Sequence, residues 1–278
     1  MMFKTGRLLG PIAAGLLLTV GAAAFNPAPV AQTVRAATAP AVTPEIRKAL
    51  APTGTLRVGV YDGGPSSMVK LASGEKAGVA YDLGHELGRR LGVPVEVVQF
   101  ERVAQVVDAL KAGAVDFSVT NSTPARAALA DYTPPIIDVE LGYLVVPGSP
   151  VKTIADVDKP GVRIGVLEGS TSLGALTAIY KNAKVLTAPS LEAARTMLTS
   201  HAAEAYATNK SNLNEMSDQL PGSHVLDGNW GFEHMAVGVP KGRDAGFAYI
   251  KAFAAEAKAS GAVARAAHRA GLRGAVGL

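Results

Sequence analysis

The chain has 278 residues, of which 48% are hydrophobic and 18% are charged, a composition typical of globular proteins. It contains no cysteine, which excludes disulfide bridges, thiolate metal sites, a cysteine nucleophile and a lipid-modified N-terminal cysteine. The net charge is +4, but residues 1–39 hold three basic and no acidic residues, so the remainder of the chain carries a net charge of only +1. Because that remainder has no basic cluster and only 5% of all residues are aromatic, we expect no nucleic-acid partner.

Residues 1–24 have the parts of a secretory signal peptide. Lys4 and Arg7 are followed by an apolar stretch at 8–20 and by Ala22-Ala23-Ala24, a cleavage site. A second small-residue motif offers an alternative cleavage site as late as residue 39. The apolar stretch is short for the ~20 residues that span a membrane, which disfavours an anchor. We therefore expect a periplasmic protein that is not a lipoprotein.

Residues 25–43 are rich in alanine and proline and predict a flexible spacer. Thr43-Pro44 then predicts a helix start, with threonine as the cap and proline in the first turn. Beyond Gly54 short apolar runs alternate with segments of helical periodicity. The expected strands and helices are 56–61, 81–91 (helix), 95–100, 102–112 (helix) and 115–120. This alternation is typical of parallel βαβ units.

The same alternation then starts again. The second series comprises 162–167, 172–181 (helix), 184–187, 191–199 (helix) and 204–208. The two series also match in sequence, because 106–121 aligns without a gap on 194–209. That alignment places Asp116 on Glu204 and Asn121 on Asn209.

The repetition predicts two α/β lobes that face each other across a cleft. Asn121 and Asn209 then lie on opposite walls of that cleft. We expect two extended crossings between the lobes, at 136–146 and 234–240, and two final helices at 247–258 and 263–270. The first lobe is predicted to comprise 44–146 plus 237–278, and the second 147–236.

Several segments, in order, resemble the bacterial extracellular solute-binding proteins of family 3, the periplasmic receptors of polar amino-acid ABC importers. They are "GVAYDLGHELGRRLG", "VVDALKAGAVDFSVTNSTPAR", "DYTPP", "RIGVLEGSTS" and "HMAVGVPKG". The resemblance implies the two-lobed periplasmic-binding-protein fold, in which each lobe is a mostly parallel sheet flanked by helices and two hinge crossings join the lobes. It also implies a monomer that delivers a small solute to an inner-membrane ABC permease and its ATPase. No cofactor is expected.

In this family an arginine after the loop of the fourth strand grips the carboxylate of the ligand. The motif Thr123-Pro124-Ala125-Arg126 places that role on Arg126. Thr123 is a good helix cap, so Arg126 falls in a first turn, where the helix dipole opposes a cation by about 0.3–1 kcal/mol and an anion reverses that cost. The alternative is a solvated surface arginine.

Two further patterns suggest contacts with an anion. Ser170, Thr171 and Ser172 follow Gly169 between a strand and a helix, where hydroxyls and backbone N–H groups bind anions; simple capping is the alternative. In the second lobe, the aspartate with which the family pairs the ammonium of its ligand is replaced here by Asn209. Because asparagine cannot neutralise an ammonium, we expect a ligand that is anionic or zwitterionic and that need not be an α-amino acid.

The remaining candidates have weaker support. The loop from 116 to 126 is two residues shorter than in typical family members, and only Tyr61 supplies an aromatic side chain near the first strand. Lys210 is a second anion contact or an ordinary helix-start lysine, and Trp230 lines the cleft or packs in a core. Glu140 shares a face with Asp138 that meets the cleft or water. The full candidate set for ligand binding is Tyr61, Asn121, Thr123, Arg126, Glu140, Ser170, Thr171, Ser172, Asn209, Lys210 and Trp230.

We expect a receptor and not an enzyme. The sequence around Ser172 misses the first glycine of a hydrolase elbow, and the five histidines form no H-x-x-x-H pair, so no metal site is expected. One alternative is a periplasmic enzyme of the same fold, similar to cyclohexadienyl dehydratases, which would need an acid such as Glu140 or Glu233 in the cleft. Another is a soluble co-receptor for a membrane sensor.

Overall fold

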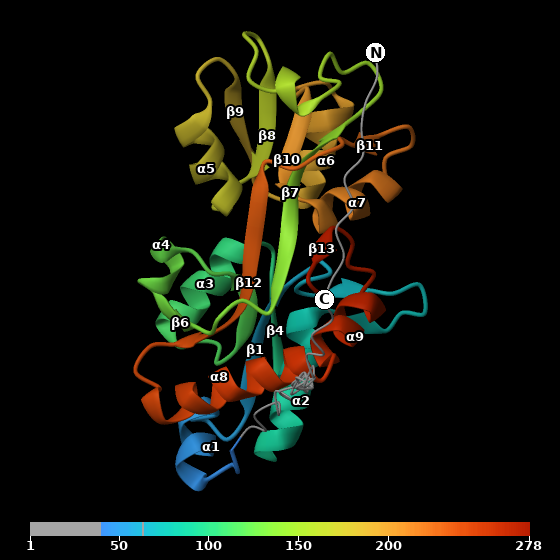
Figure 1. The fold of residues 1–278 in the computed structure, drawn as a ribbon. Coiled ribbons are helices and arrows are strands. Elements are labelled where there is room, and N and C mark those ends of the chain that lie inside the picture. The colour runs from blue at the N-terminus through green and yellow to red at the C-terminus, as the bar shows by residue number, and fades with distance from the viewer. Residues whose placement is uncertain (1–39, 63) are drawn as a thin grey trace, which may run out of the picture. The chain divides into compact units, whose positions relative to one another are not determined.

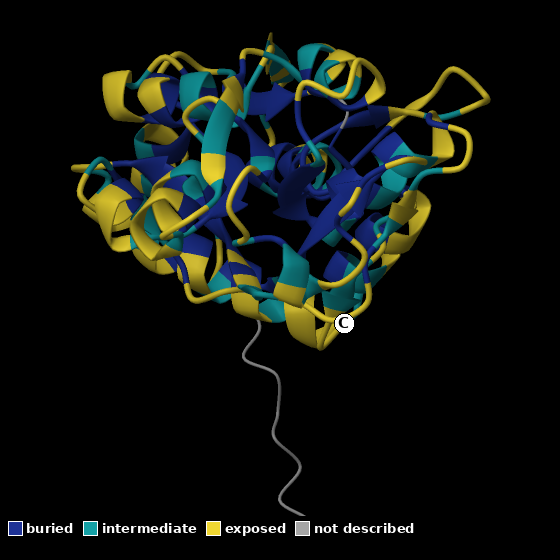
Figure 2. Ribbon diagram, turned by 90° about the horizontal axis from the view of Figure 1, so that it is seen from above, coloured by how far each residue is buried: buried dark blue, intermediate teal, exposed yellow. Residues whose placement is uncertain are grey.

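A computed structural model describes residues 40–62 and 64–278 of the chain. The predicted signal peptide and residues 25–39 of the predicted spacer lie outside these ranges. The described residues form an α/β fold of two lobes with separate hydrophobic cores (Figure 1). Buried strands occupy the interior, and the exposed residues lie on the outer helices and loops (Figure 2). Within the described ranges, no helix has the length and apolarity needed to cross a membrane.

The first lobe is built on the parallel pair β1 and β4 and the helices beside them. The predicted cap of its first helix is confirmed, since the Thr43 hydroxyl accepts a hydrogen bond from the Ile46 N–H. Gly92 and Gly113 end α2 and α3 in the left-handed conformation that glycine adopts without strain. Its elements are α1 (Pro44–Leu50), β1 (Leu56–Tyr61), β2 (Val69–Lys70), β3 (Lys76–Ala77), α2 (Val79–Leu91), β4 (Val95–Phe100), α3 (Val103–Ala112), β5 (Ser118–Asn121), α4 (Pro124–Ala127), β6 (Ala130–Tyr132), α8 (Asp244–Ala259) and α9 (Ala262–Arg269).

The second lobe repeats this pattern on three parallel strands, in which β8 lies between β9 and β10. Serine or asparagine side chains cap its three α-helices. Its elements are η1 (Ile154–Asp156), β8 (Arg163–Leu167), α5 (Thr171–Ile179), β9 (Lys184–Ala188), α6 (Leu191–Thr199), β10 (Ala205–Asn209), α7 (Lys210–Asp218) and β11 (His224–Val225).

Two long antiparallel strands, β7 (Ile137–Val145) and β12 (Gly231–Pro240), run side by side through both lobes (Figure 1). Val139 and Met235 belong to the core of the first lobe, whereas Tyr143 belongs to that of the second. These strands are the two crossings that the sequence predicts. The short strand β13 (Ala275–Val276) pairs with Asp138 and Val139 of β7, beside the core of the first lobe.

The sequence repeat corresponds to a repeated ion pair. In the first lobe the Arg57 guanidinium binds the fully buried Asp116 at 2.7 Å, and the Arg57 N–H also donates to that carboxylate. In the second lobe Arg163 makes the same two contacts with Glu204. The Asp116 carboxylate also binds Arg243. The backbone N–H groups of Asp116 and Phe117 both donate to the Arg57 carbonyl, which interrupts the regular ladder, and β5 starts at Ser118 rather than at the predicted residue 115.

Candidate functional site

A buried arginine, Arg126, lies on α4, a single helical turn of the first lobe. Thr123 caps this turn by accepting a hydrogen bond from the Arg126 N–H at 3.3 Å, as predicted. The residue is 8% exposed, and its Nη1 donates to the Asn121 carbonyl at 3.2 Å. No acidic side chain in residues 40–62 and 64–278 forms an ion pair with it. A helical turn of this length has little dipole, which leaves little of the predicted dipole effect. An anionic partner is favourable instead because the guanidinium is buried.

The hydroxyl residues at the start of α5 have three different roles. Ser170 caps the helix by accepting a hydrogen bond from the Leu173 N–H at 3.2 Å. Thr171 Oγ1 lies 3.1 Å from Asn121 Nδ2, which donates to it, and itself donates to Glu233 Oε1 at 3.1 Å. Ser172 is buried without a hydrogen-bond partner. Thr171 therefore links the first lobe, the second lobe and β12.

A second contact also joins the two walls. Arg102 Nη1, which precedes α3, lies 3.1 Å from Glu168 Oε2, which follows β8. Next to this ion pair, Gly169 approaches α3 so closely that a Cβ built on it would lie 2.6 Å from the Ala104 Cβ. The loop of residues 168–171 is therefore in direct contact with the first lobe.

Between these contacts lies a cavity of about 30 Å³, which is room for about two water molecules. The structure brings Asn121 and Asn209 to it from the first and second lobes, together with Arg126, Ser170, Thr171 and Tyr61. Its lining comprises Tyr61, Val103, Asn121, Arg126, Leu167, Ser170, Thr171, Thr208, Asn209, Asn212, Glu233 and Met235.

A larger cavity of about 430 Å³ adjoins this small one and shares Arg126, Ser170 and Thr171 with it. Its other walls are mainly apolar or small residues of α3, α4 and the start of α5, with Asp108 and Thr123. The guanidinium residue thus belongs to both spaces, so a solute too large for the small cavity has room to extend into the larger one.

Tyr61 ends β1 with its side chain buried beside the small cavity. Burial raises the pKa of its hydroxyl, and the neighbouring side chains of Ser66 and, to a smaller extent, Asn212 partly oppose this effect. The hydroxyl is therefore protonated at neutral pH and available both to donate and to accept hydrogen bonds.

Four predicted candidates lie outside the lining of both cavities. Lys210 Nζ pairs with Glu140 Oε2 at 2.6 Å and lowers the pKa of that carboxyl. Trp230 donates from Nε1 to the Gly142 carbonyl at 3.2 Å and packs 6.2 Å from the Tyr143 ring, against the core of the second lobe. These contacts agree with the structural alternatives for Lys210 and Trp230. Ser172 also lies outside both linings.

The structure adds Glu233, Asn212 and Thr208 to the site. Glu233 was considered only as the acid that an enzyme would need. The signal that identifies it is the start of β12, where the buried residues 233 and 235 flank the exposed residue 234 before the fully buried stretch 235–240. A glutamate on the inward face of an alternating strand predicts a functional or paired carboxylate.

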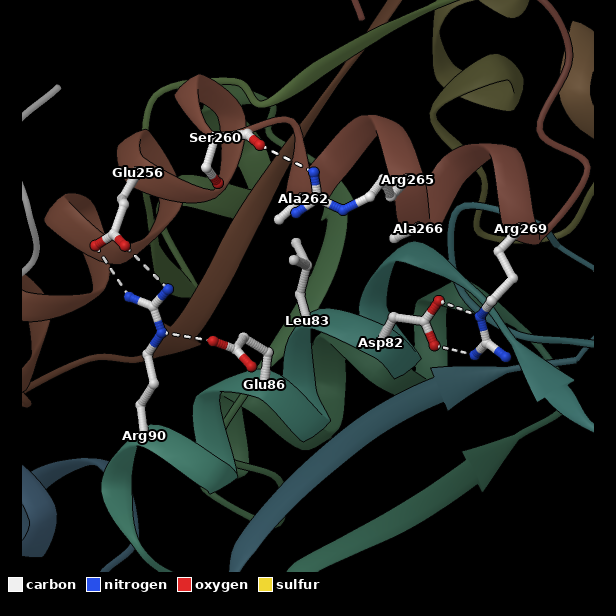
Figure 3. Close-up of a pocket in the computed structure, with 10 residues that line it drawn as sticks. All are labelled: Asp82, Leu83, Glu86, Arg90, Glu256, Ser260, Ala262, Arg265, Ala266 and Arg269. Atoms are coloured by element: carbon white, nitrogen blue, oxygen red, sulfur yellow. Dashed lines mark hydrogen bonds and ion pairs between the residues drawn. The ribbon is translucent and has the colours of Figure 1, made fainter.

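A charged hollow of about 490 Å³ in the first lobe lies elsewhere, between α2, α8 and α9 (Figure 3). Its acids are paired with arginines of the same hollow, as Arg90 is with Glu86 and Glu256, and Arg269 with Asp82. Ion pairs thus satisfy these groups, and they leave no carboxylate for a ligand. Over the described ranges, no group of three or more His, Asp or Glu side chains could hold a metal ion.

Comparisons with known proteins agree on one family. The sequence model described as "Bacterial extracellular solute-binding proteins, family 3" matches residues 56–270. No curated protein sequence matches the chain.

Solved structures with the same fold include binding proteins for amino acids. An L-cysteine solute receptor of Neisseria gonorrhoeae is 25% identical, with a TM-score of 0.71 over 81% of this chain and 92% of its own. The ancestral amino acid-binding protein AncCDT-1, a precursor of cyclohexadienyl dehydratase, is 25% identical, with a TM-score of 0.69 over 80% and 98%. The amino acid ABC transporter substrate-binding protein AbpA of Streptococcus pneumoniae, bound to L-arginine, shares the fold at 18% identity, with a TM-score of 0.71 over 80% and 97%.

Proposed function

Because the chain belongs to family 3 of the bacterial extracellular solute-binding proteins, we propose that it binds a small carboxylate-bearing solute between its two lobes. The observation that carries this proposal is Arg126, a buried guanidinium with no acidic partner in the described residues and on the wall of both cavities. A carboxylate would neutralise it and accept two parallel hydrogen bonds. Ser170 and Thr171 would face the same carboxylate from the second lobe.

Binding would proceed by opening and closing of the lobes. A cavity of about 30 Å³ is far smaller than the roughly 300 Å³ of typical ligand sites, so the loop of residues 168–171 must separate from α3 to admit a solute. The strands β7 and β12 would act as the hinge. A solute that contacts both lobes favours the closed state, because only that state offers it all contacts.

The cellular role follows from the family and the N-terminal pattern. We propose that the protein is a periplasmic monomer, exported by the signal peptide predicted at residues 1–24, and that it delivers its solute to an inner-membrane ABC permease and its ATPase. In this role the protein needs no cofactor and no chemical step.

Calorimetry on Arg126→Ala tests the carboxylate site. The probes are the solute that co-purifies with the protein, identified by mass spectrometry, and a panel of L-amino acids, 2-oxo acids and dicarboxylates. Loss of a buried charge pair costs about 2–5 kcal/mol, so the affinity should fall at least about 30-fold. The matched control is Arg265→Ala, in the hollow of Figure 3, which should bind as the wild type does. Unchanged affinity in a folded Arg126→Ala would refute the proposal.

A second function, catalysis on the same fold, is favoured by one observation: a buried carboxylate, Glu233, lines the cavity together with Arg126. Both Glu233 oxygens accept hydrogen bonds, from Asn209 and Thr171, which suits an ionised carboxylate better than a proton donor. Incubation with a cyclohexadienyl carboxylate, monitored by the absorbance of an aromatic product, tests this alternative. Turnover that is lost in Glu233→Gln would favour the enzyme over the receptor.

A further inference from the structure

A buried carboxylate lies close to Arg126 without pairing with it. Glu233 on β12 is 8% exposed, and it accepts hydrogen bonds from Asn209 Nδ2 at 2.7 Å and from Thr171 Oγ1 at 3.1 Å. Both donors are neutral, and no lysine, arginine or histidine among the described residues forms an ion pair with this carboxylate. A buried charge without a counter-charge is costly. The small cavity therefore has one unpaired charge of each sign on its wall.

A second acceptor in the same cavity has no donor. Asn212 on α7 is 6% exposed, and its Oδ1 forms no hydrogen bond. Its backbone N–H donates to Asn209 Oδ1 at 3.0 Å, and its side chain meets the Tyr61 hydroxyl. A buried acceptor without a donor costs about 1–3 kcal/mol, a cost that an N–H group of a ligand would remove.

The orientation of Asn209 explains why an amide suits this position. Its Oδ1 is occupied by the Asn212 N–H, so its Nδ2 must face the Glu233 carboxylate. A carboxylate at position 209 would place two negative charges at hydrogen-bond distance, because the two side chains are 2.7 Å apart. The negative charge of the site is thus carried by position 233, on the hinge strand, and not by the start of α7.

We infer that Glu233 and Asn212 form a subsite for a protonated amine of the solute, opposite the carboxylate site at Arg126. This inference rests on the proposed function and refines it, because it makes the solute a zwitterion with N–H groups to donate. The expectation from Asn209 alone, a ligand that need not be an α-amino acid, is then replaced. A quaternary ammonium lacks N–H donors and leaves Asn212 Oδ1 unsatisfied, so this subsite discriminates against it.

Matched pairs of solutes test the subsite on the full mature protein. The probes are L-amino acids, their 2-hydroxy and 2-oxo acid analogues, which lack the amine, and their N-trimethylated analogues. The wild type should bind at least one amino acid about 30-fold or more tightly than its analogues. Preference for the hydroxy or oxo acid would overturn the subsite while Arg126 and the proposed function stand. A wild type that binds no member of any series would overturn both.

Charge relocation tests the residue assignment. Glu233→Gln should weaken binding of the amino acid about 30-fold or more but leave binding of its hydroxy acid nearly unchanged. Adding Asn209→Asp to Glu233→Gln restores one carboxylate 2.7 Å away and should recover part of the lost affinity. Glu86→Gln, a partly buried carboxylate of α2 outside the cavity, is the control and should bind as the wild type does. Equal losses for amino acid and hydroxy acid, with no recovery in the double variant, would show that Glu233 only supports the fold.

Discussion

Replacing Gly169 with alanine should separate two surfaces that meet at the cleft. A Cβ at this position lies 2.6 Å from the Ala104 Cβ, whereas ordinary contacts lie at 3.4–4 Å. The loop and α3 must therefore move apart by about 1 Å, which breaks the packing between them. Gly169 also has a φ of +70°, a left-handed conformation that costs alanine about 1–2 kcal/mol.

Gly113→Ala separates the two effects. Gly113 has a φ of +66°, and a Cβ there meets nothing within 4 Å. Both variants should lose about 1–2 kcal/mol in the free energy of unfolding, measured with urea, because the backbone cost is the same. Only Gly169→Ala should also bind the co-purified solute more weakly and compact less on binding, measured by calorimetry and X-ray scattering.

Removing the facing methyl group completes the test. Adding Ala104→Gly to Gly169→Ala relieves the contact but not the backbone strain, so affinity should recover while stability does not. If Gly169→Ala and Gly113→Ala bind the solute equally well, the contact between the loop and α3 has no role in closure, and the reasoning fails.

Three further predictions concern stability. Asp116→Asn should lower the free energy of unfolding by about 3–5 kcal/mol, because Asp116 is fully buried. Glu204→Gln should lower it by only about 1 kcal/mol, because the arginine that pairs with Glu204 is 42% exposed. Urea titration measures both values. Arg89 and a second arginine hold the pKa of Glu86 at about 2, so its ion pairs stabilise the fold above about pH 4.5 and are lost as the pH falls towards 2. Glu86→Gln should flatten the dependence of stability on pH in that window. Trp230→Ala should lower stability by about 1–3 kcal/mol, seen by thermal denaturation, with unchanged solute affinity.

The secondary structure follows closely from the sequence because local patterns determine it. The periodicity over 102–112 leads to α3 within one residue at each end, and the capping residues Thr43 and Thr123 lead to the starts of α1 and α4. The repeat that aligns Asp116 with Glu204 corresponds to the same ion pair in both lobes. The start of β5 is less predictable, because it depends on the hydrogen bonds that Asp116 and Phe117 make to Arg57, which in the chain is 59 residues from Asp116.

The side chains of the site depend on contacts between distant residues. Arg126 is recognisable because its motif is local, and Asn121 and Asn209 because both end aligned strands. Glu140 and Lys210 are 70 residues apart in the chain, and only the fold brings them within 2.6 Å, so each looks like a separate ligand candidate. A residue type at one position therefore cannot tell whether its charge is offered to a ligand or satisfied by a neighbour.

Asn209 shows how this limit affects a functional inference. The missing acid at this position suggested that the ligand need not be an α-amino acid, since no neighbouring residue in the chain supplies a negative charge. In the folded protein β12 brings Glu233 within 2.7 Å of the Asn209 amide. A carboxylate is therefore present at this place in the cavity, but it comes from β12 and not from the start of α7. What recognises a solute is the set of charges and hydrogen-bonding atoms around the cavity, and a strand from elsewhere in the chain can supply any member of that set.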